Sequence, residues 1–367
     1  MHYLNDLKKI IEINSYTKNP TGVNSVGEVF DKWLIALDFE VLLHKRESIG
    51  HHRLYKSIHI QNEKKLLLLG HIDTVFAPQK FEEFTEDEEW VYGPGVCDMK
   101  GGNIVIVEAL RELQKEKIPI QNIDILFVSD EETGSDDSKL LTAKLANEYD
   151  YCFVYEAAGE NLEVVTGRKG VGTFFIDIEG KAAHAGNSYS DGFDANLEAS
   201  YKLQELVKLT DLDKGTTVNV GKMEGGIGAN TISPHSHLTF ELRYKTKEEK
   251  ERVLKAIEKI VSNSFVSGTC STLSGGIQRD VMQTSDASLE LIENIYKLTE
   301  QKLPSEERGG VSDANIVSAE GVVTLDGFGP FGDGDHTVKE RALKSSFESR
   351  IELSRVLFKH FSKHFKF

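Results

Sequence analysis

Hydrophobic and polar positions in the first half of the chain alternate between two patterns. Residues 24–37 carry apolar side chains at helical spacing, whereas 66–69 are four consecutive leucines. The first pattern predicts an amphipathic helix and the second a strand buried on both faces. By the same criteria we expect helices at 102–115 and 137–148 and strands at 123–128 and 151–155. Strands separated by helices of this length favour a mostly parallel sheet.

From about residue 170 the pattern becomes that of a smaller α+β unit. Residues 172–179 alternate apolar and polar side chains, as a half-exposed strand does. We then expect a helix at 194–209, strands at 216–222 and 237–244, a helix at 247–262 and a strand at 264–272. This strand–helix–strand–strand–helix–strand order is typical of a two-layer, ferredoxin-like domain.

The last part of the chain returns to helices around one buried strand. We expect helices at 286–301, 312–319 and 343–365 and the strand at 322–325. A chain of 367 residues is also longer than one hydrophobic core usually supports. The sequence therefore predicts an α/β domain with a mostly parallel sheet, interrupted by an inserted α+β domain.

Composition and charge exclude several classes of protein. The net charge of −16 argues against nucleic-acid binding, because phosphate contacts require concentrated Lys and Arg. Three cysteines without CxxC spacing indicate neither a disulfide framework nor a zinc ribbon. Residues 1–11 resemble a short amphipathic helix rather than a signal peptide, and no apolar run could span a bilayer. We therefore expect a cytoplasmic protein that binds no membrane.

A histidine and several acidic residues follow the ends of the expected strands. His71 and Asp73 come directly after the leucine run, and their spacing lets Asp73 hold the His71 imidazole in the tautomer that a metal requires. Glu131 and Glu132 follow strand 123–128, and Glu156 follows strand 151–155. Adjacent carboxylates point differently, so one could bind a metal while the other acts as a base. The alternative for each is a solvated polar loop.

Two glycine-rich loops carry further candidates. Asp98 lies in the glycine-rich loop 93–102. This loop could be a cation site, or alternatively a phosphate-binding loop or a plain turn. An aspartate among glycines suits a cation better than a phosphate. His336 closes the loop 327–336. In open α/β sheets, ligands bind at the carboxyl ends of strands, so these residues together predict a metal site. His184, among small residues, is either a functional residue or a surface-turn histidine.

Taken together, these motifs resemble the M20 family of metallopeptidases, which includes glutamate carboxypeptidase, acetylornithine deacetylase, succinyl-diaminopimelate desuccinylase and aminoacylases. Six motifs occur in order over essentially the whole chain. The resemblance implies two divalent ions, one held by His71 and Glu156 and the other by Glu132 and His336, with Asp98 as the bridge. It also implies that Asp73 orients His71 and that Glu131 is the general base.

The resemblance further assigns roles to the domains. Residues 1–168 and 280–367 would form the catalytic domain, and 169–279 an inserted dimerisation or lid domain. Asn230 and Arg243 would bind the substrate carboxylate, Gly310 would contact substrate from the loop 309–313, and His184 would stabilise the oxyanion, in dimeric relatives at the neighbouring subunit's site. We therefore expect a homodimer.

The expected activity is cleavage of an amide bond next to a free carboxylate in an N-acyl amino acid or dipeptide. Glu156, in place of an aspartate, favours carboxypeptidase or deacylase chemistry, and Gly93-Pro94-Gly95 resembles the glutamate carboxypeptidase branch. No lysine follows in residues 157–163, so the side-chain preference stays open. Nitrogen and oxygen ligands favour Zn²⁺, with Co²⁺ and Mn²⁺ as alternatives. The rival hypothesis is a non-catalytic relative that binds acyl-amino acids or small peptides.

Overall fold

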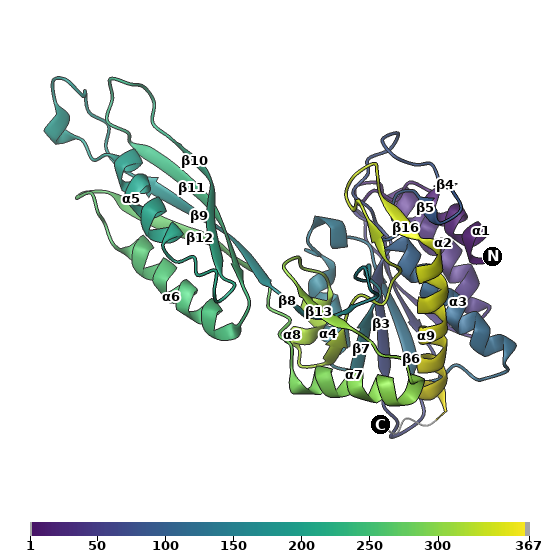
Figure 1. Ribbon diagram of the computed structural model, residues 1–367. Helices are drawn as coiled ribbons and strands as arrows, with labels where there is room; N and C mark the ends of the chain where they lie inside the picture. The colour runs from purple at the N-terminus through teal and green to yellow at the C-terminus, as the bar shows by residue number, and fades with distance from the viewer. Residues whose placement is uncertain (1, 364–367) are drawn as a thin grey trace. The chain divides into compact units, whose positions relative to one another are not determined.

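The computed structural model describes residues 2–363, which divide into two compact units (Figure 1). The first unit comprises the described residues up to Gly167, Thr284–Arg308 and those from Ser312 onward. The second comprises Arg168–Gln283 and Gly309–Val311. Among the described residues, no helix combines the length and the hydropathy that a membrane span requires.

A six-stranded sheet forms the centre of the first unit. Its strands, in spatial order, are β1 (Glu40–His44), β2 (His52–Lys56), β6 (Ile123–Val128), β3 (Leu66–His71), β7 (Tyr151–Val154) and β14 (Val323–Leu325). The last four run parallel to one another, whereas β1 and β2 add an antiparallel edge. The predicted α/β fold with a mostly parallel sheet is therefore confirmed.

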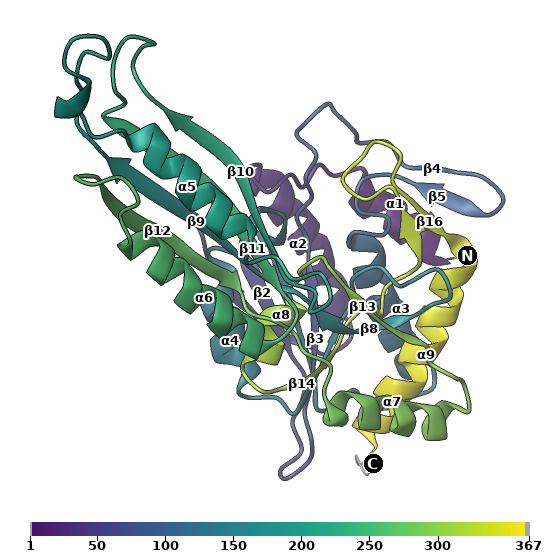
Figure 2. The same ribbon diagram turned by 60° about the vertical axis from the view of Figure 1, so that its left-hand side comes forward.

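Helices cover both faces of this sheet. They are α1 (His2–Ile11), α2 (Pro20–Ile35), α3 (Lys100–Lys115), α4 (Ser138–Ala146), α7 (Asp286–Thr299), α8 (Ala314–Ala319) and α9 (Lys344–Ser362). Helix α3 packs against α1 and α9 on one side of the sheet, and α4 packs against α8 on the other (Figures 1 and 2). Between these layers the leucines of β3 are fully buried, as their continuous apolar run predicts. The last residues of the helix predicted at 343–365 lie outside the described residues.

Several strands of the first unit were not predicted. Besides β1 and β2, they are β8 (Val164–Arg168) paired with β13 (Ser305–Arg308), and a small sheet of β15 (Gly332–Asp333), β16 (Arg341–Leu343), β5 (Trp90–Tyr92) and β4 (Thr85–Glu86). Strand β2 lacks an apolar run because it buries Arg53, whose guanidinium is paired with Asp31 and donates to the His51 carbonyl. Polar partners elsewhere in the chain thus stabilise a strand whose own sequence gives no hydrophobic signal.

The second unit is a four-stranded antiparallel sheet with two helices. Its elements, in chain order, are β9 (Gly170–Glu179), α5 (Ala195–Val207), β10 (Thr217–Gly225), β11 (His235–Tyr244), α6 (Lys247–Ser262) and β12 (Cys270–Arg279). The order of strands and helices is the predicted one, and the sheet order is β10-β11-β9-β12. The strand expected at 264–272 was misplaced. Strand β12 contains two serines, a threonine and two glycines, and only its last residue is buried, so it shows no apolar alternation.

A buried ion pair stabilises the second unit. Lys202 and Glu198, both on α5 and both fully buried, lie 3.0 Å apart. The Lys202 ammonium also donates to three backbone carbonyls at the end of α6 and just after it, the nearest that of Asn263 at 2.6 Å. Removing one partner of such a pair leaves the other buried and uncompensated.

We therefore expect Lys202→Ala to lower the free energy of unfolding by about 3–5 kcal/mol. The matched control is Lys208→Ala, because Lys208, the residue directly after α5, makes an exposed pair with Glu205 of that helix. Loss of this pair should cost less than about 1 kcal/mol. Urea denaturation followed by circular dichroism measures both values. Equal effects of the two substitutions would show that the buried pair makes no special contribution.

Candidate metal centre

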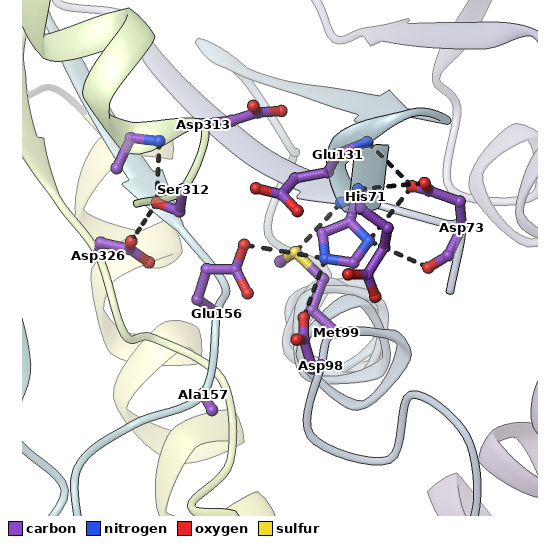
Figure 3. A network of polar contacts seen from close by, with 12 residues as sticks. His71, Asp73, Asp98, Met99, Glu131, Glu156, Ala157, Ser312, Asp313 and Asp326 are labelled. Atoms are coloured by element: carbon purple, nitrogen blue, oxygen red, sulfur yellow. Dashed lines mark hydrogen bonds and ion pairs between the residues drawn. The ribbon is translucent and has the colours of Figure 1, made fainter. Parts of the chain in front are cut away.

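The parallel strands bring four of the candidate residues to one edge of the sheet. Strand β3 lies between β6 and β7, so the carboxyl ends of all three strands meet at the same edge. His71 is the last residue of β3, Glu131 and Glu132 follow β6, and Glu156 follows β7. Figure 3 shows His71 with Asp98, Glu131 and Glu156 around it. Sheet topology thus assembles residues that lie up to 85 positions apart in the sequence.

Asp98 occupies the centre of the cluster. One of its carboxylate oxygens lies 3.0 Å from Nε2 of His71, and the other lies 3.2 Å from Nε2 of His336. The same nitrogen of His336 lies 3.2 Å from Oε2 of Glu132, and Nε2 of His71 lies 3.8 Å from Oε1 of Glu156. The two ends of the Asp98 carboxylate therefore face two different histidine–glutamate pairs.

Asp73 contacts His71, Glu131 and Glu132 but is not itself a candidate ligand. Its carboxylate lies 3.4 Å from Nδ1 of His71, on the side of the ring opposite Asp98, and accepts a 2.6 Å hydrogen bond from the hydroxyl of Thr17. The backbone N–H groups of Glu131 and Glu132 also donate to it, both at 3.3 Å. Asp73 therefore fixes the His71 ring and the turn that carries both glutamates. Thr17 was not identified from the sequence.

Helix α3 and the residue before it contact the backbone of His71. The Asn103 amide donates to the His71 carbonyl at 2.7 Å, and the Met99 sulfur accepts from the His71 N–H. A Cβ at position 70 would lie 2.2 Å from the Asn103 side-chain oxygen, so any larger residue there would displace the Asn103 amide. Asn103 was not identified from the sequence, because it lies within a helix pattern that carries no separate signal.

The two adjacent glutamates face different directions. They begin a short 3-10 turn, Glu131–Thr133, which ends at Gly134 with a left-handed φ of 99°. Glu132 contacts His336, whereas the Glu131 side chain extends toward Glu156 (Figure 3). Consistent with that placement, the charge of Glu131 is one of those that raise the pKa of Glu156, after burial and the charge of Asp98. This divergence allows one carboxylate to bind a metal and the other to act on water.

The cluster concentrates negative charge in a buried place. Burial and the charge of Asp98 raise the pKa of Glu132 to about 8. Burial also disfavours ionised Asp98, but hydrogen bonds with His336 and His71 outweigh it and hold the Asp98 pKa well below its usual range. Hydrogen bonds with Asp98 and Glu132 raise the pKa of His336 to about 11. Protons on His336 and Glu132 thus offset the negative charge of the carboxylates. A bound cation could offset the same charge instead.

The donor set fits divalent cations. Two imidazoles and three carboxylates supply nitrogen and oxygen ligands, which suit Zn²⁺ and related ions. Ligand atoms of His71, Asp98 and Glu132 all lie within 4.8 Å of one another. The His336 side chain is 59% exposed, so the cluster is open to an ion from solution. These residues could therefore hold metal without a large rearrangement.

The predicted substrate-binding residues and His184 lie in the second unit. Arg243, on β11, donates to the Gly309 carbonyl at 2.9 Å and is paired with Glu241. Arg168 donates to the carbonyl of Gly310 at 3.2 Å. A β-bridge joins His184 to Thr231, the neighbour of Asn230, and Nδ1 of the exposed His184 accepts two backbone N–H groups. Their roles in catalysis stay predictions.

Comparison with known proteins agrees with the motifs. A profile of peptidase family M20/M25/M40 matches residues 67–360. Carboxypeptidase G2 from Pseudomonas sp. (strain RS-16) is 28% identical over 343 residues, which cover 91% of this chain and 82% of that protein.

Solved structures share the fold. A tripeptidase from Staphylococcus aureus superposes with a TM-score of 0.82 at 21% identity, covering 99% of this chain and 98% of that one. A Bacillus subtilis protein described as a dinuclear metal-binding peptidase of the M20 family gives a TM-score of 0.70 at 14% identity, covering 98% and 97%. The family resemblance predicted from the motifs is confirmed, and the profile match spans most of the chain. We conclude that this protein belongs to peptidase family M20/M25/M40 and is a hydrolase of the metallopeptidase class.

Proposed function

We propose that this protein is a two-metal hydrolase that cleaves an amide bond next to a free carboxylate, as a carboxypeptidase or N-acyl-amino-acid deacylase. The observation that carries the proposal is the position of Asp98, whose two oxygens face His71 and His336. In this proposal His71 and Glu156 would hold one ion, Glu132 and His336 would hold the other, and Asp98 would be the ligand that both ions share. Zn²⁺ is the expected metal, with Co²⁺ and Mn²⁺ as alternatives.

The chemical step depends on Glu131. Divalent ions in this cluster would polarise the scissile carbonyl and lower the pKa of water. The Glu131 carboxylate, held by the Asp73-bound turn, takes a proton from the attacking water and returns it to the departing amine. Asp73 keeps His71 oriented throughout.

The second unit supplies the proposed substrate contacts. The Arg243 guanidinium can bind the substrate carboxylate with two parallel hydrogen bonds. Asn230 and Gly310 add contacts to the substrate, and His184 donates a hydrogen bond to the developing oxyanion. We propose that His184 acts from the partner in a homodimer. The carboxypeptidase relative, which aligns over most of both chains, supports a peptide-like substrate with a free carboxylate.

A substrate panel tests this function. N-acyl amino acids and dipeptides are incubated with protein loaded with Zn²⁺, Co²⁺ or Mn²⁺, and each active substrate is compared with its carboxamide, in which the free carboxylate is blocked. We expect turnover of the free acid and at least a 100-fold lower kcat/KM for the carboxamide, because the Arg243 guanidinium loses its charged partner on the substrate. Stoichiometric metal without turnover of any substrate would favour the non-catalytic binder.

Metal removal should abolish activity and lower stability together. The cluster gathers three carboxylates in a buried place, so an ion bound there stabilises the folded state by mass action, about 2.7 kcal/mol at 100 times Kd. Dialysis against a chelator is expected to remove hydrolysis and lower Tm by several degrees, and added Zn²⁺ should restore both. Full activity of protein shown to be metal-free would contradict the proposal.

A further inference from the structure

A buried carboxylate lies beneath the loop that carries Asp98. Glu340, four residues after His336, is only 1% exposed. Its Oε2 accepts the N–H of Gly95 at 3.0 Å, and its Oε1 accepts the N–H groups of Cys97 and Asp98, each at 3.1 Å. The backbone carbonyl of the same residue accepts the N–H of Gly93 at 3.3 Å.

These bonds determine the shape of the loop. Residues 93–99 belong to neither a helix nor a strand, so their N–H groups need partners outside regular structure. Gly93 and Gly95 have positive φ values of 152° and 86°, which let successive N–H groups turn toward one side chain. A buried carboxylate is costly unless it is hydrogen-bonded, and here the loop N–H groups bond to both of its oxygens.

The same contacts join the two glycine-rich loops of the metal centre. Asp98 itself donates its N–H to Glu340, while its carboxylate lies between His71 and His336. A second link runs from the Cys97 thiol to Asp335, 2.8 Å away and next to His336. The backbone that carries the central carboxylate is therefore fixed directly to the segment that carries one of the two histidines.

We infer that Glu340 is a positioning residue, which sets the place of the Asp98 carboxylate and its spacing from His336. The inference rests on the proposed function, because it matters only if Asp98 binds metal. Outer-shell partners of metal ligands typically contribute 10–100-fold to metal affinity or activity. Glu340 contacts the backbone of the ligand rather than its side chain, so its effect on the metal is geometric.

Glu340→Gln tests this inference with little change of volume. The amide has one acceptor oxygen, so its NH₂ group must face at least one loop N–H that now bonds to a carboxylate oxygen. The matched control is Asp124→Asn. Asp124 is also fully buried and accepts a backbone N–H, from Ser57, but it lies near the start of β6, at the opposite end of the strand from the site.

Cobalt binding to the metal-stripped full-length chain is the measurement. Wild-type protein should bind two Co²⁺ ions with visible absorption bands; failure to do so would refute the proposed function itself. Glu340→Gln should bind Co²⁺ 10–100-fold more weakly with altered bands, whereas Asp124→Asn should keep wild-type affinity and bands even if its Tm falls. Wild-type affinity and bands in a folded Glu340→Gln protein would overturn the inference.

A second variant covers the case in which Glu340→Gln does not fold. Glu340→Asp keeps the charge but withdraws the carboxylate by one methylene, so the loop N–H groups bond to it at longer range. We expect Glu340→Asp to bind Co²⁺ with an affinity between those of wild type and Glu340→Gln. If Glu340→Gln does not fold, we expect Glu340→Asp to bind Co²⁺ several-fold more weakly than wild type. Wild-type affinity and bands in Glu340→Asp with a lowered Tm would assign the residue a purely structural role.

Discussion

Replacing Glu131 by glutamine is expected to lower kcat by about 10²–10⁴-fold while metal content stays at the wild-type value. The proposed base would lose its ability to accept a proton, because an amide has no basic oxygen at neutral pH. The turn itself should persist, since the bond from position 131 to Asp73 uses the backbone N–H. Initial rates on the best substrate of the panel, with metal content by atomic spectrometry, measure both quantities.

Glu132→Gln is the matched control for this prediction. It is the neighbouring residue, its N–H also donates to Asp73, and its carboxylate contacts His336. We expect Glu132→Gln to lose metal as well as activity. High metal concentrations should restore part of the rate of Glu132→Gln but should not raise the rate of Glu131→Gln. Turnover near the wild-type rate in Glu131→Gln would remove Glu131 from the mechanism.

Asp98→Asn is expected to weaken binding of both metal ions by more than about 100-fold, beyond the range typical of outer-shell residues. Asp98 is the residue whose carboxylate faces both histidines, and the amide replaces one of its oxygens with an N–H donor that cannot bind a cation. Activity should fall with the metal content. Isothermal titration of the metal-free protein with Zn²⁺ gives stoichiometry and affinity.

Asp73→Asn is the comparison for Asp98→Asn, and we expect it to lose less metal affinity. Asp73 contacts the ring nitrogen of His71 that faces away from Asp98, so its loss should weaken binding by about 10–100-fold without changing the number of ions. If Asp98→Asn bound two ions with wild-type affinity, Asp98 could not be the shared ligand.

The sequence predicted the main sheet and its site because both depend on local patterns. The leucines of β3 and the apolar residues of β6 identify buried strands, and polar residues just after them are expected at one sheet edge. His71 and Glu132 were found in this way. Asp98 and His336 required glycine-rich loops as a second signal, and the family resemblance supplied their expected roles.

Residues that act through long-range hydrogen bonds could not be found by these patterns. Thr17 precedes α2 and Asn103 lies within α3, and each contacts the site only through the tertiary fold. Glu340 lies in a charged stretch of sequence that resembles an exposed loop, although its side chain is buried. Strand β12 was misplaced for a related reason, since main-chain pairing with β9 rather than apolar alternation determines its bounds.

The most direct test of the two-metal site is anomalous X-ray diffraction from crystals grown with Zn²⁺. We predict two anomalous peaks, one beside His71 and Glu156, the other beside Glu132 and His336, with the Asp98 carboxylate in contact with both. The Glu131 side chain should contact neither peak. A single peak, or two peaks of which only one touches Asp98, would contradict the proposed site.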